Sequence, residues 1–195
     1  MLVGPGLGQE GYVRAFMRSL LPLLGAETVR GVVIDADGLN NLSKVEGWWE
    51  GLAAPTVVTP HPGEMSRLTG LSMEEIQSDR LAVAKRYSGE WGVTVVLKGA
   101  NTVVAAANPD GQGGRARLSP FANPGLASGG TGDVLAGAIV GLMAQALEPY
   151  EAASLGVYLH GLAGERVREE LGSAGMVAGD LLPALPRAMK GLRGE

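Results

Sequence analysis

The chain has 195 residues, a formal net charge of −4 and no cysteine, which excludes disulfide bonds and thiolate metal sites. A chain of this length buries roughly 70% of its unfolded surface, so we expect one domain over residues 1–195 with a substantial core. The acidic balance argues against a general nucleic-acid-binding protein, which usually shows a basic face, but it leaves room for an anionic nucleotide. The chain has no apolar run near the ~20 residues of a membrane span and no signal-peptide pattern, so we expect a soluble, cytoplasmic protein without membrane contact.

The first half of the chain alternates helical and strand patterns. The expected elements are a helix over residues 10–24, strands over 31–36 and 56–59, and a helix over 73–88. For the last of these helices, Ser72 is the expected N-cap and Glu75 stands at capping-box spacing. Between the two strands, Trp48 and Trp49 are expected at the surface or at an interface.

The second half starts with strands and ends in helices. The expected elements are strands over residues 93–98 and 102–107, a mobile turn over 108–114, and helices over 134–147, 151–171 and 180–192. The residues 99–101 between the two strands are Gly-Ala-Asn, which predicts a hairpin-like turn. The helix over 134–147 is apolar nearly all round, so we expect it to be buried. Continuously apolar strands are typical of a parallel sheet covered on both faces, so the order of elements predicts an α/β three-layer sandwich with a mostly parallel central sheet flanked by helices.

Polar side chains directly follow three of the predicted strands. Asp35 and Asp37 follow the first, His61 and Glu64 follow the second, and Lys98 closes the third. In open α/β sheets, ligands bind at the carboxyl ends of the strands. Converging polar groups on an otherwise apolar sheet therefore predict a ligand pocket at this edge.

Each of these residues also has an alternative interpretation. Lys98 either neutralises a phosphate as a point charge or is a surface lysine at a strand end. His61 either hydrogen-bonds a polar substrate or packs in a turn stiffened by its two flanking prolines. Asp35 and Asp37 either position Mg²⁺ through water or cap the next helix. His160, in the middle of a predicted helix, is expected to have a packing role.

The most informative stretch is the loop of small residues over 123–133, which leads into the apolar helical pattern at Val134. The free N–H groups and the positive dipole end of a helix N-terminus attract phosphate. A carboxylate beside such a site, Asp133, is suited to accept a proton from a hydroxyl that is about to meet a phosphoryl group. The alternative interpretation is that Asp133 is simply the N-cap of the helix.

Seven segments in family order together resemble the ADP/ATP-dependent NAD(P)H-hydrate dehydratases, a group within the ribokinase-like superfamily. The matching segments are VGPGLG (3–8), VVIDADGLN (32–40), TPHPGEMSRLTG (59–70), LKGANTVVA (97–105), NPGLASGGTGDVLAGAIVGLMAQ (123–145), GVYLHGLAGE (156–165) and GMVAGDLLPALP (175–186). The GTGD part is shared with many small-molecule kinases. The HPGEM segment and the run from NPG to GTGDVLAG are together much more specific.

The resemblance implies a role for each matching residue. The implied nucleotide-binding residues are Lys98, Gly99, Ala100, Asn101 and Thr102, with Gly129, Gly130, Thr131 and Gly132 forming an anion hole. The implied substrate-binding residues are Gly8, His61, Asn123 and Asp133, and Asp133 is the implied catalytic base. The implied reaction is a repair reaction: ADP or ATP drives dehydration of (S)-NAD(P)HX to NAD(P)H, through phosphorylation of the ring hydroxyl and elimination. Mg²⁺ is the implied cofactor, and a homo-oligomer, a tetramer in the family, is the implied assembly.

The chain departs from the family pattern at its start. Members of the family usually carry a further stretch before the segment at 3–8, with the first strands of the sheet and a Gly-rich loop. We therefore expect a fold that lacks this N-terminal part, with an exposed sheet edge unless a partner covers it. Two other functions stay open on the sequence: a kinase of the same superfamily that acts on a heterocyclic alcohol, and an inactive, truncated nucleotide-binding protein.

Overall fold

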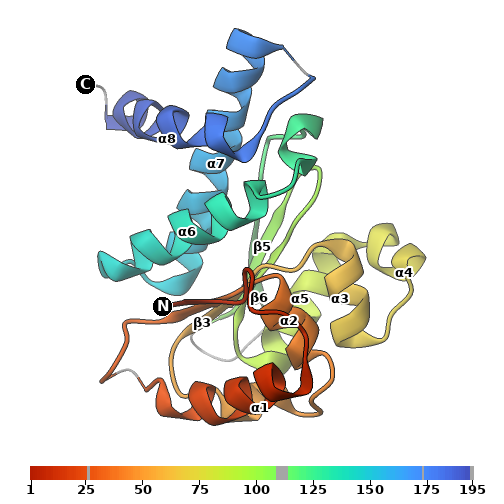
Figure 1. Ribbon diagram of the computed structural model, residues 1–195. Helices are drawn as coiled ribbons and strands as arrows, with labels where there is room; N and C mark the ends of the chain where they lie inside the picture. The colour runs from red at the N-terminus through yellow and green to blue at the C-terminus, as the bar shows by residue number, and fades with distance from the viewer. Residues whose placement is uncertain (26, 109–113, 173, 194–195) are drawn as a thin grey trace.

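A computed structural model of the chain describes residues 1–25, 27–108, 114–172 and 174–193. Within these ranges a six-stranded sheet has helices on both faces (Figure 1). The strands, in spatial order, are β1 (Leu2–Val3), β2 (Val32–Ile34), β3 (Thr56–Val58), β4 (Thr94–Leu97), β5 (Val103–Ala107) and β6 (Gly114–Leu118). Strands β1 to β4 pair in parallel, and β4–β5 and β5–β6 pair antiparallel. The mostly parallel sandwich predicted from the sequence is thus confirmed.

The four predicted strands are present as β2 to β5, and β4 and β5 form the predicted hairpin. The sequence analysis missed β1 and β6. β1 has two residues, and β6 (GRARL) is polar and partly exposed, so neither gives a strong apolar run. Most of the turn expected over 108–114 lies outside the described residues, and Gly114 begins β6.

The strands separate two apolar cores because successive side chains point to opposite faces of a sheet. In β2, Val32 and Ile34 belong to one core and Val33 belongs to the other. In β4, Leu97 and Val96 are divided in the same way. The sheet is therefore buried on both faces, which is why its strands are continuously apolar in the sequence.

Short helices from the first half of the chain cover one face. These helices are α1 (Gly11–Leu20), α2 (Asp37–Leu42), α3 (Pro62–Thr69), α4 (Met73–Ser78) and α5 (Arg80–Trp91). The single helix predicted over 73–88 is wrong, because Asp79 adopts a non-helical conformation (φ −149°, ψ 77°) between α4 and α5. Its carboxylate accepts from the Ala82 N–H at 2.8 Å, so Asp79 caps a new helix instead of continuing the old one. The capping box of Ser72 and Glu75 is confirmed.

The tryptophan pair lies in a short 3₁₀ turn, Trp48–Gly51, on this same face. Trp48 is buried, with its ring centroid 5.1 Å from that of Trp91 and 5.7 Å from that of Trp49. The expected surface position is therefore wrong for Trp48. Aromatic side chains bury large apolar areas, so a scarce Trp is a strong candidate for the core even in an irregular segment.

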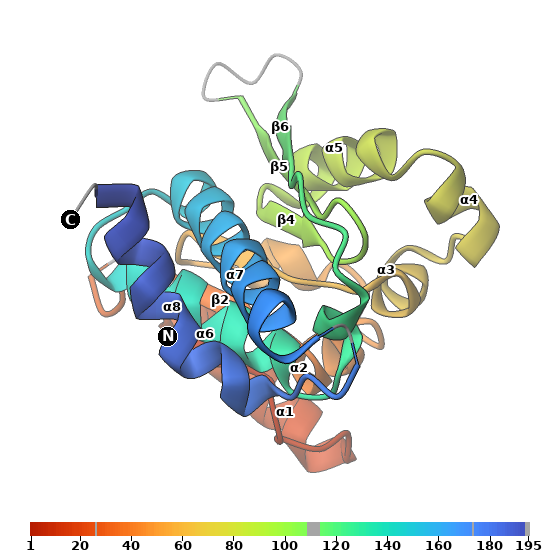
Figure 2. The ribbon, with the colours of Figure 1, turned by 90° about the horizontal axis from the view of Figure 1, so that it is seen from above.

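Three longer helices cover the opposite face (Figure 2). They are α6 (Thr131–Ala144), α7 (Pro149–Leu171) and α8 (Ala178–Arg193). In α6, Leu135 and Ile139 face the core, while Gly137 and Gly141 are exposed. The prediction that this helix is buried on all sides is therefore wrong. Glycines on its outer side make the sequence pattern apolar there, but they add no side chain that could be buried. No helix in the described ranges combines the length and the apolar character needed to cross a bilayer.

A close backbone contact fixes the loop that leaves β1 at the edge of the sheet. Gly4 has φ +136°, and a Cβ built on it would lie 1.8 Å from the carbonyl oxygen of Asp35. A Cβ on Gly38, at the start of α2, would lie 2.9 Å from the carbonyl oxygen of Val3. Only glycines allow the loop after β1 to lie directly on the β2–α2 junction.

We expect Gly4→Ala to lower the free energy of unfolding by about 3 kcal/mol, since the added Cβ overlaps a backbone oxygen that cannot rotate away. Gly6→Ala is the matched control: Gly6 also has positive φ (+73°), but nothing lies within 4 Å of its Cβ position, so it isolates the backbone term of about 1 kcal/mol. Urea unfolding measures both. Equal losses would contradict the steric argument.

Candidate active site

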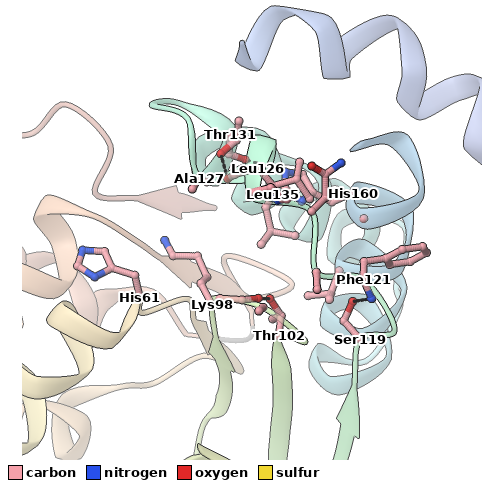
Figure 3. A pocket seen from close by; sticks show the side chains of 18 of the residues that line it. His61, Lys98, Thr102, Ser119, Phe121, Leu126, Ala127, Thr131, Leu135 and His160 are labelled. Carbon is pink, nitrogen blue, oxygen red and sulfur yellow. Dashed lines mark hydrogen bonds between the residues drawn. The ribbon is translucent and has the colours of Figure 1, made fainter. Parts of the chain in front are cut away.

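A cavity of about 520 Å³ opens between the end of β4, the first turn of α6 and the middle of α7 (Figure 3). The sequence-predicted residues that line it are His61, Lys98, Gly99, Ala100, Thr102, Asn123, Thr131 and Gly132. The predicted residues outside its lining are Gly8, Asn101, Gly129, Gly130 and Asp133. Ser119, Phe121 and His160 also line it, and the sequence analysis had assigned none of them to the site. The pocket predicted at the carboxyl ends of the strands is present, but of the polar residues that follow the strands only His61 and Lys98 line it, while Asp35, Asp37 and Glu64 do not.

The turn between β4 and β5 forms one wall of the cavity. Within it, the Thr102 hydroxyl donates to the Gly99 carbonyl oxygen at 3.0 Å. The Asn101 N–H donates to the Phe121 carbonyl oxygen at 2.9 Å, and the Asn101 side chain donates to the Ser119 carbonyl oxygen at 3.0 Å. Asn101 therefore ties the turn to the segment after β6 and does not line the cavity, so its role in nucleotide binding stays a prediction.

A buried ion pair lies at the base of this wall. The Lys98 Nζ lies 2.6 Å from Asp35 Oδ1 and 3.8 Å from Glu64 Oε2. The two carboxylates are 1% and 5% exposed. Burial raises the pKa of Glu64, and the ammonium of Lys98 opposes that rise. Lys98 is thus a half-buried counter-ion at the pocket, and its interpretation as a surface lysine at a strand end is wrong.

His61 is the N-cap of α3. Its Nδ1 accepts from the N–H groups of Gly63 (3.0 Å) and Glu64 (3.3 Å), while Glu64 accepts from the His61 N–H at 2.8 Å. Burial lowers the pKa of His61, and the positive charges of Lys98 and Arg67 lower it further. A neutral ring whose Nδ1 accepts carries its hydrogen on Nε2, which lies 3.4 Å from Glu64 Oε1.

The first turn of α6 faces the ion pair. Its N-cap is Gly130 (φ +83°), which has no side chain to cap the helix. A Cβ built on Gly132 would lie 3.4 Å from Lys98 Nζ and 3.8 Å from Asp35 Oδ2. A helix N-terminus without a side-chain cap and a lysine ammonium at one place favour an anion such as phosphate.

Asp133 lies in that first turn, directly after the lining residue Gly132. Its side chain is exposed. It is not the N-cap, since Gly130 holds that position, so the capping interpretation of Asp133 is wrong. Its role as a base stays a prediction.

Asp37 serves the loop after β1. Its carboxylate accepts from the Gly8 N–H and from the Gln9 side chain, each at 3.0 Å. Asn41 donates to the Gly8 carbonyl oxygen at 2.9 Å. Neither Asp35 nor Asp37 caps α2, whose N-cap is Ala36 and has no side-chain hydrogen bond, so the capping alternative is wrong for both.

The far wall of the cavity comes from α7. His160 is buried, and its Nε2 lies 2.9 Å from the Thr131 carbonyl oxygen. Burial lowers the pKa of His160 to about 4, so the ring is neutral at pH 7 and donates through Nε2. Asn123 donates to the Gly164 carbonyl oxygen and accepts from the Gly125 N–H, both at 2.9 Å. These bonds hold the start of the Gly-rich loop on α7.

Two buried carboxylates, Asp35 and Glu64, lie behind the cavity lining at Lys98. No cluster of three or more His, Cys, Asp or Glu side chains suited to a metal occurs in the described ranges. Mg²⁺ usually takes only one or two carboxylates and completes its shell with water and substrate phosphates. Asp35 and Glu64, which share Lys98 but do not line the cavity, are the two carboxylates that Mg²⁺ would use beside the oxygens of a nucleotide.

Comparisons with known proteins show the family of the chain. The family model described as NAD(P)H-hydrate dehydratase matches residues 1–187. The bifunctional NAD(P)H-hydrate repair enzyme of Moorella thermoacetica is 44% identical over 100% of this chain and 35% of its own length. The ADP-dependent (S)-NAD(P)H-hydrate dehydratase of Neisseria meningitidis is 40% identical over 94% of this chain and 60% of its own length.

A solved structure gives the same picture. It is a crystal structure of the ADP/ATP-dependent NAD(P)H-hydrate dehydratase from Bacillus subtilis, co-crystallised with ATP and Mg²⁺ and soaked with CoA. It superposes with a TM-score of 0.80 at 35% identity and covers 97% of this chain and 65% of that protein. The chain thus spans from about a third to just under two thirds of the length of these relatives.

The low pKa of His160 predicts a pH effect on stability. The unfolded chain binds this proton near pH 6.5 and the folded chain only near pH 4, so the free energy of unfolding falls as the pH drops through that window. In His160→Gln the amide still donates toward Thr131 but does not titrate. We expect the parent to lose about 3 kcal/mol more than this variant between pH 7 and pH 4. Urea unfolding at stepped pH measures it, and parallel pH curves would contradict it.

The buried ion pair predicts non-additive substitutions. Lys98→Met leaves the Asp35 carboxylate buried without its partner, which we expect to cost about 3–5 kcal/mol of stability. The double variant Lys98→Met/Asp35→Asn removes both charges and should recover more than half of that loss. Urea unfolding at pH 7 tests the pair. A double variant no more stable than Lys98→Met would show that the charges are not coupled.

Proposed function

We propose that this chain, which belongs to the NAD(P)H-hydrate dehydratase family, catalyses the ADP- or ATP-dependent dehydration of (S)-NAD(P)HX to NAD(P)H. The observation that carries the proposal is the meeting of Lys98 with the first turn of α6 at one cavity (Figure 3). A reaction that transfers a phosphoryl group needs such a place, where positive charge and backbone donors converge on the phosphates.

The nucleotide binds along the β4–β5 turn. Lys98 supplies the charge for the terminal phosphates, while Gly99, Ala100 and Thr102 line the cavity beside it. The Gly-rich run 129–132 presents the N-terminal N–H groups of α6 to the phosphoryl group in transfer. The apolar wall of Phe121, Leu126 and Val157 suits the flat face of an adenine base.

The hydrated nicotinamide lies on the side of Asp133, His61 and Gly8. Asp133 takes the proton of the ring hydroxyl, whose oxygen attacks the terminal phosphorus and displaces the rest of the nucleotide. The C–O bond of the resulting phosphate ester then breaks as a proton leaves the neighbouring ring carbon, which gives NAD(P)H and free phosphate. His61 lines the cavity on the substrate side, and Asp37 fixes the backbone of Gly8.

Asp35 and Glu64 would hold Mg²⁺ when a nucleotide is bound, and the ion would supply charge that neutralises the phosphates. Lys98 is the cation that pairs with these carboxylates in the structure, and its charge opposes the rise that burial causes in the pKa of Glu64.

Asp133→Asn tests the base. The amide keeps the size of the side chain but cannot take a proton, so we expect turnover to fall by about 10²–10⁴-fold with ADP affinity within about threefold of the parent. Glu74→Gln is the matched control, since Glu74 is an exposed acid in the first turn of α4. Single-turnover kinetics with NADHX and calorimetry with ADP give the two readouts. Near-parent turnover in Asp133→Asn would rule out the assignment.

The function itself is tested by incubating the 195-residue chain with NADHX, Mg²⁺ and either ADP or ATP. Recovery of NADH absorbance with stoichiometric phosphate release supports the proposal. Phosphorylation of thiazole or pyrimidine alcohols instead would identify a kinase, and ADP binding without any NADHX consumption would identify an inactive nucleotide-binding protein. A single domain, a homo-oligomer and a cytoplasmic location stay predictions.

A further inference from the structure

We propose that Arg80, the first residue of α5, is a positioning residue that holds the nucleotide-binding turn between β4 and β5 in its working shape. The inference rests on the proposed function for the identity of the ligand. Helix α5 packs along β4 and β5, so its N-terminus lies next to the turn (Figure 2). Neither the strand-end pattern nor the Gly-rich motif pointed to this arginine.

One guanidinium binds three carbonyl groups of the turn. Arg80 Nη2 donates to the carbonyl oxygens of Leu97 (2.8 Å) and Lys98 (3.0 Å). Arg80 Nη1 donates to the carbonyl oxygen of Ala100. These acceptors span the end of β4 and the first half of the turn. A planar group with several N–H donors in fixed directions is suited to bind them together.

The turn that Arg80 binds has an unfavourable backbone. Gly99 has φ +142° and Asn101 has φ +52°, both in regions that L side chains rarely adopt. A Cβ on Gly99 would lie 2.9 Å from Arg80 Nη2, so the guanidinium lies against the face of the glycine that has no side chain. Such conformations persist where surrounding contacts impose them, and Arg80 provides three.

The side-chain hydrogen bonds of Arg80 all go to carbonyl groups of this turn within the described ranges. Its side chain forms no ion pair with a carboxylate in the described ranges, and its buried Nε has no hydrogen-bond partner there. A cation placed against carbonyl oxygens alone is costly as a purely structural device, because a carboxylate partner would satisfy it better. We infer that the guanidinium instead fixes the orientation of the peptide groups in the turn.

That orientation matters for the ligand. The chain has no cis peptide bond in the described ranges, so the C=O and N–H of the Lys98–Gly99 peptide point in opposite directions. With the Lys98 carbonyl held by Arg80, the Gly99 N–H points away from Arg80. Lys98 and Gly99 both line the cavity. Arg80 thereby sets both the backbone donor of Gly99 and the point from which the Lys98 side chain leaves the strand.

The test compares Arg80→Lys and Arg80→Met with Arg86→Lys and Arg86→Met in the 195-residue chain. Arg86 is a matched control because it lies on the same helix, is largely exposed and is 3.9 Å from Glu90. Calorimetry measures the affinity for ADP, and hydrogen exchange measures protection of the amides at 98–102. We expect both Arg80 variants to bind ADP at least about tenfold more weakly and to exchange faster at 98–102 alone, since a lysine cannot bridge three carbonyls. We expect the Arg86 variants to match the parent.

The KM values for the two substrates distinguish a positioning role of Arg80 from a loss of folded protein. The KM for ADP should rise in Arg80→Lys while the KM for NADHX stays within about twofold, whereas a loss of folded protein lowers the apparent rate constant alone. Parent-like ADP affinity and parent-like exchange in both Arg80 variants would overturn the inference. If the parent binds ADP and Arg80 variants lose it but no NADHX is converted, the proposed function fails and the inference stands. A parent that does not bind ADP overturns both.

Discussion

The site depends on a buried ion pair that joins two strands of the sheet. Lys98 at the end of β4 and Asp35 at the end of β2 lie on either side of β3, and their charged atoms are 2.6 Å apart. Glu64, in the first turn of α3, lies 3.8 Å from the same ammonium. Buried charges are tolerated only when they are paired. The pair therefore fixes the relative position of the strand ends and leaves a positive group at the base of the cavity.

Glycines let the other walls close on this pair. Gly132 allows the first turn of α6 to approach Lys98, because a Cβ there would already lie 3.4 Å from the ammonium. On α7, a Cβ on Gly161 would lie 2.2 Å from the ring of Phe121, so the helix backbone itself forms part of the wall. At the cavity, glycines thus allow helix backbone to lie directly against side chains of other segments.

α6 connects the two sides of the site. Its first turn faces Lys98 through Gly132 and is held from behind by His160, which donates to the Thr131 carbonyl oxygen. A neutral histidine suits this place, since a charged ring would oppose the positive end of the helix that is offered to phosphate. Thr131, Gly132 and the proposed base Asp133 thus belong to one helical turn, so the proposed phosphate site and the proposed base would keep a fixed relative position.

The sequence by itself determined the layered α/β fold, four of the strands and the Lys98, His61 and Gly-rich segments of the site, because apolar periodicity and strand-end polarity are local signals. The tertiary structure decided what no local pattern encodes. It paired Lys98 with Asp35 rather than leaving it free, separated Asp37 from Asp35, and split one helix at Asp79. It also brought Arg80 and His160 to the site. Those contacts join residues far apart in the chain, so only the packing of helices on the sheet creates them.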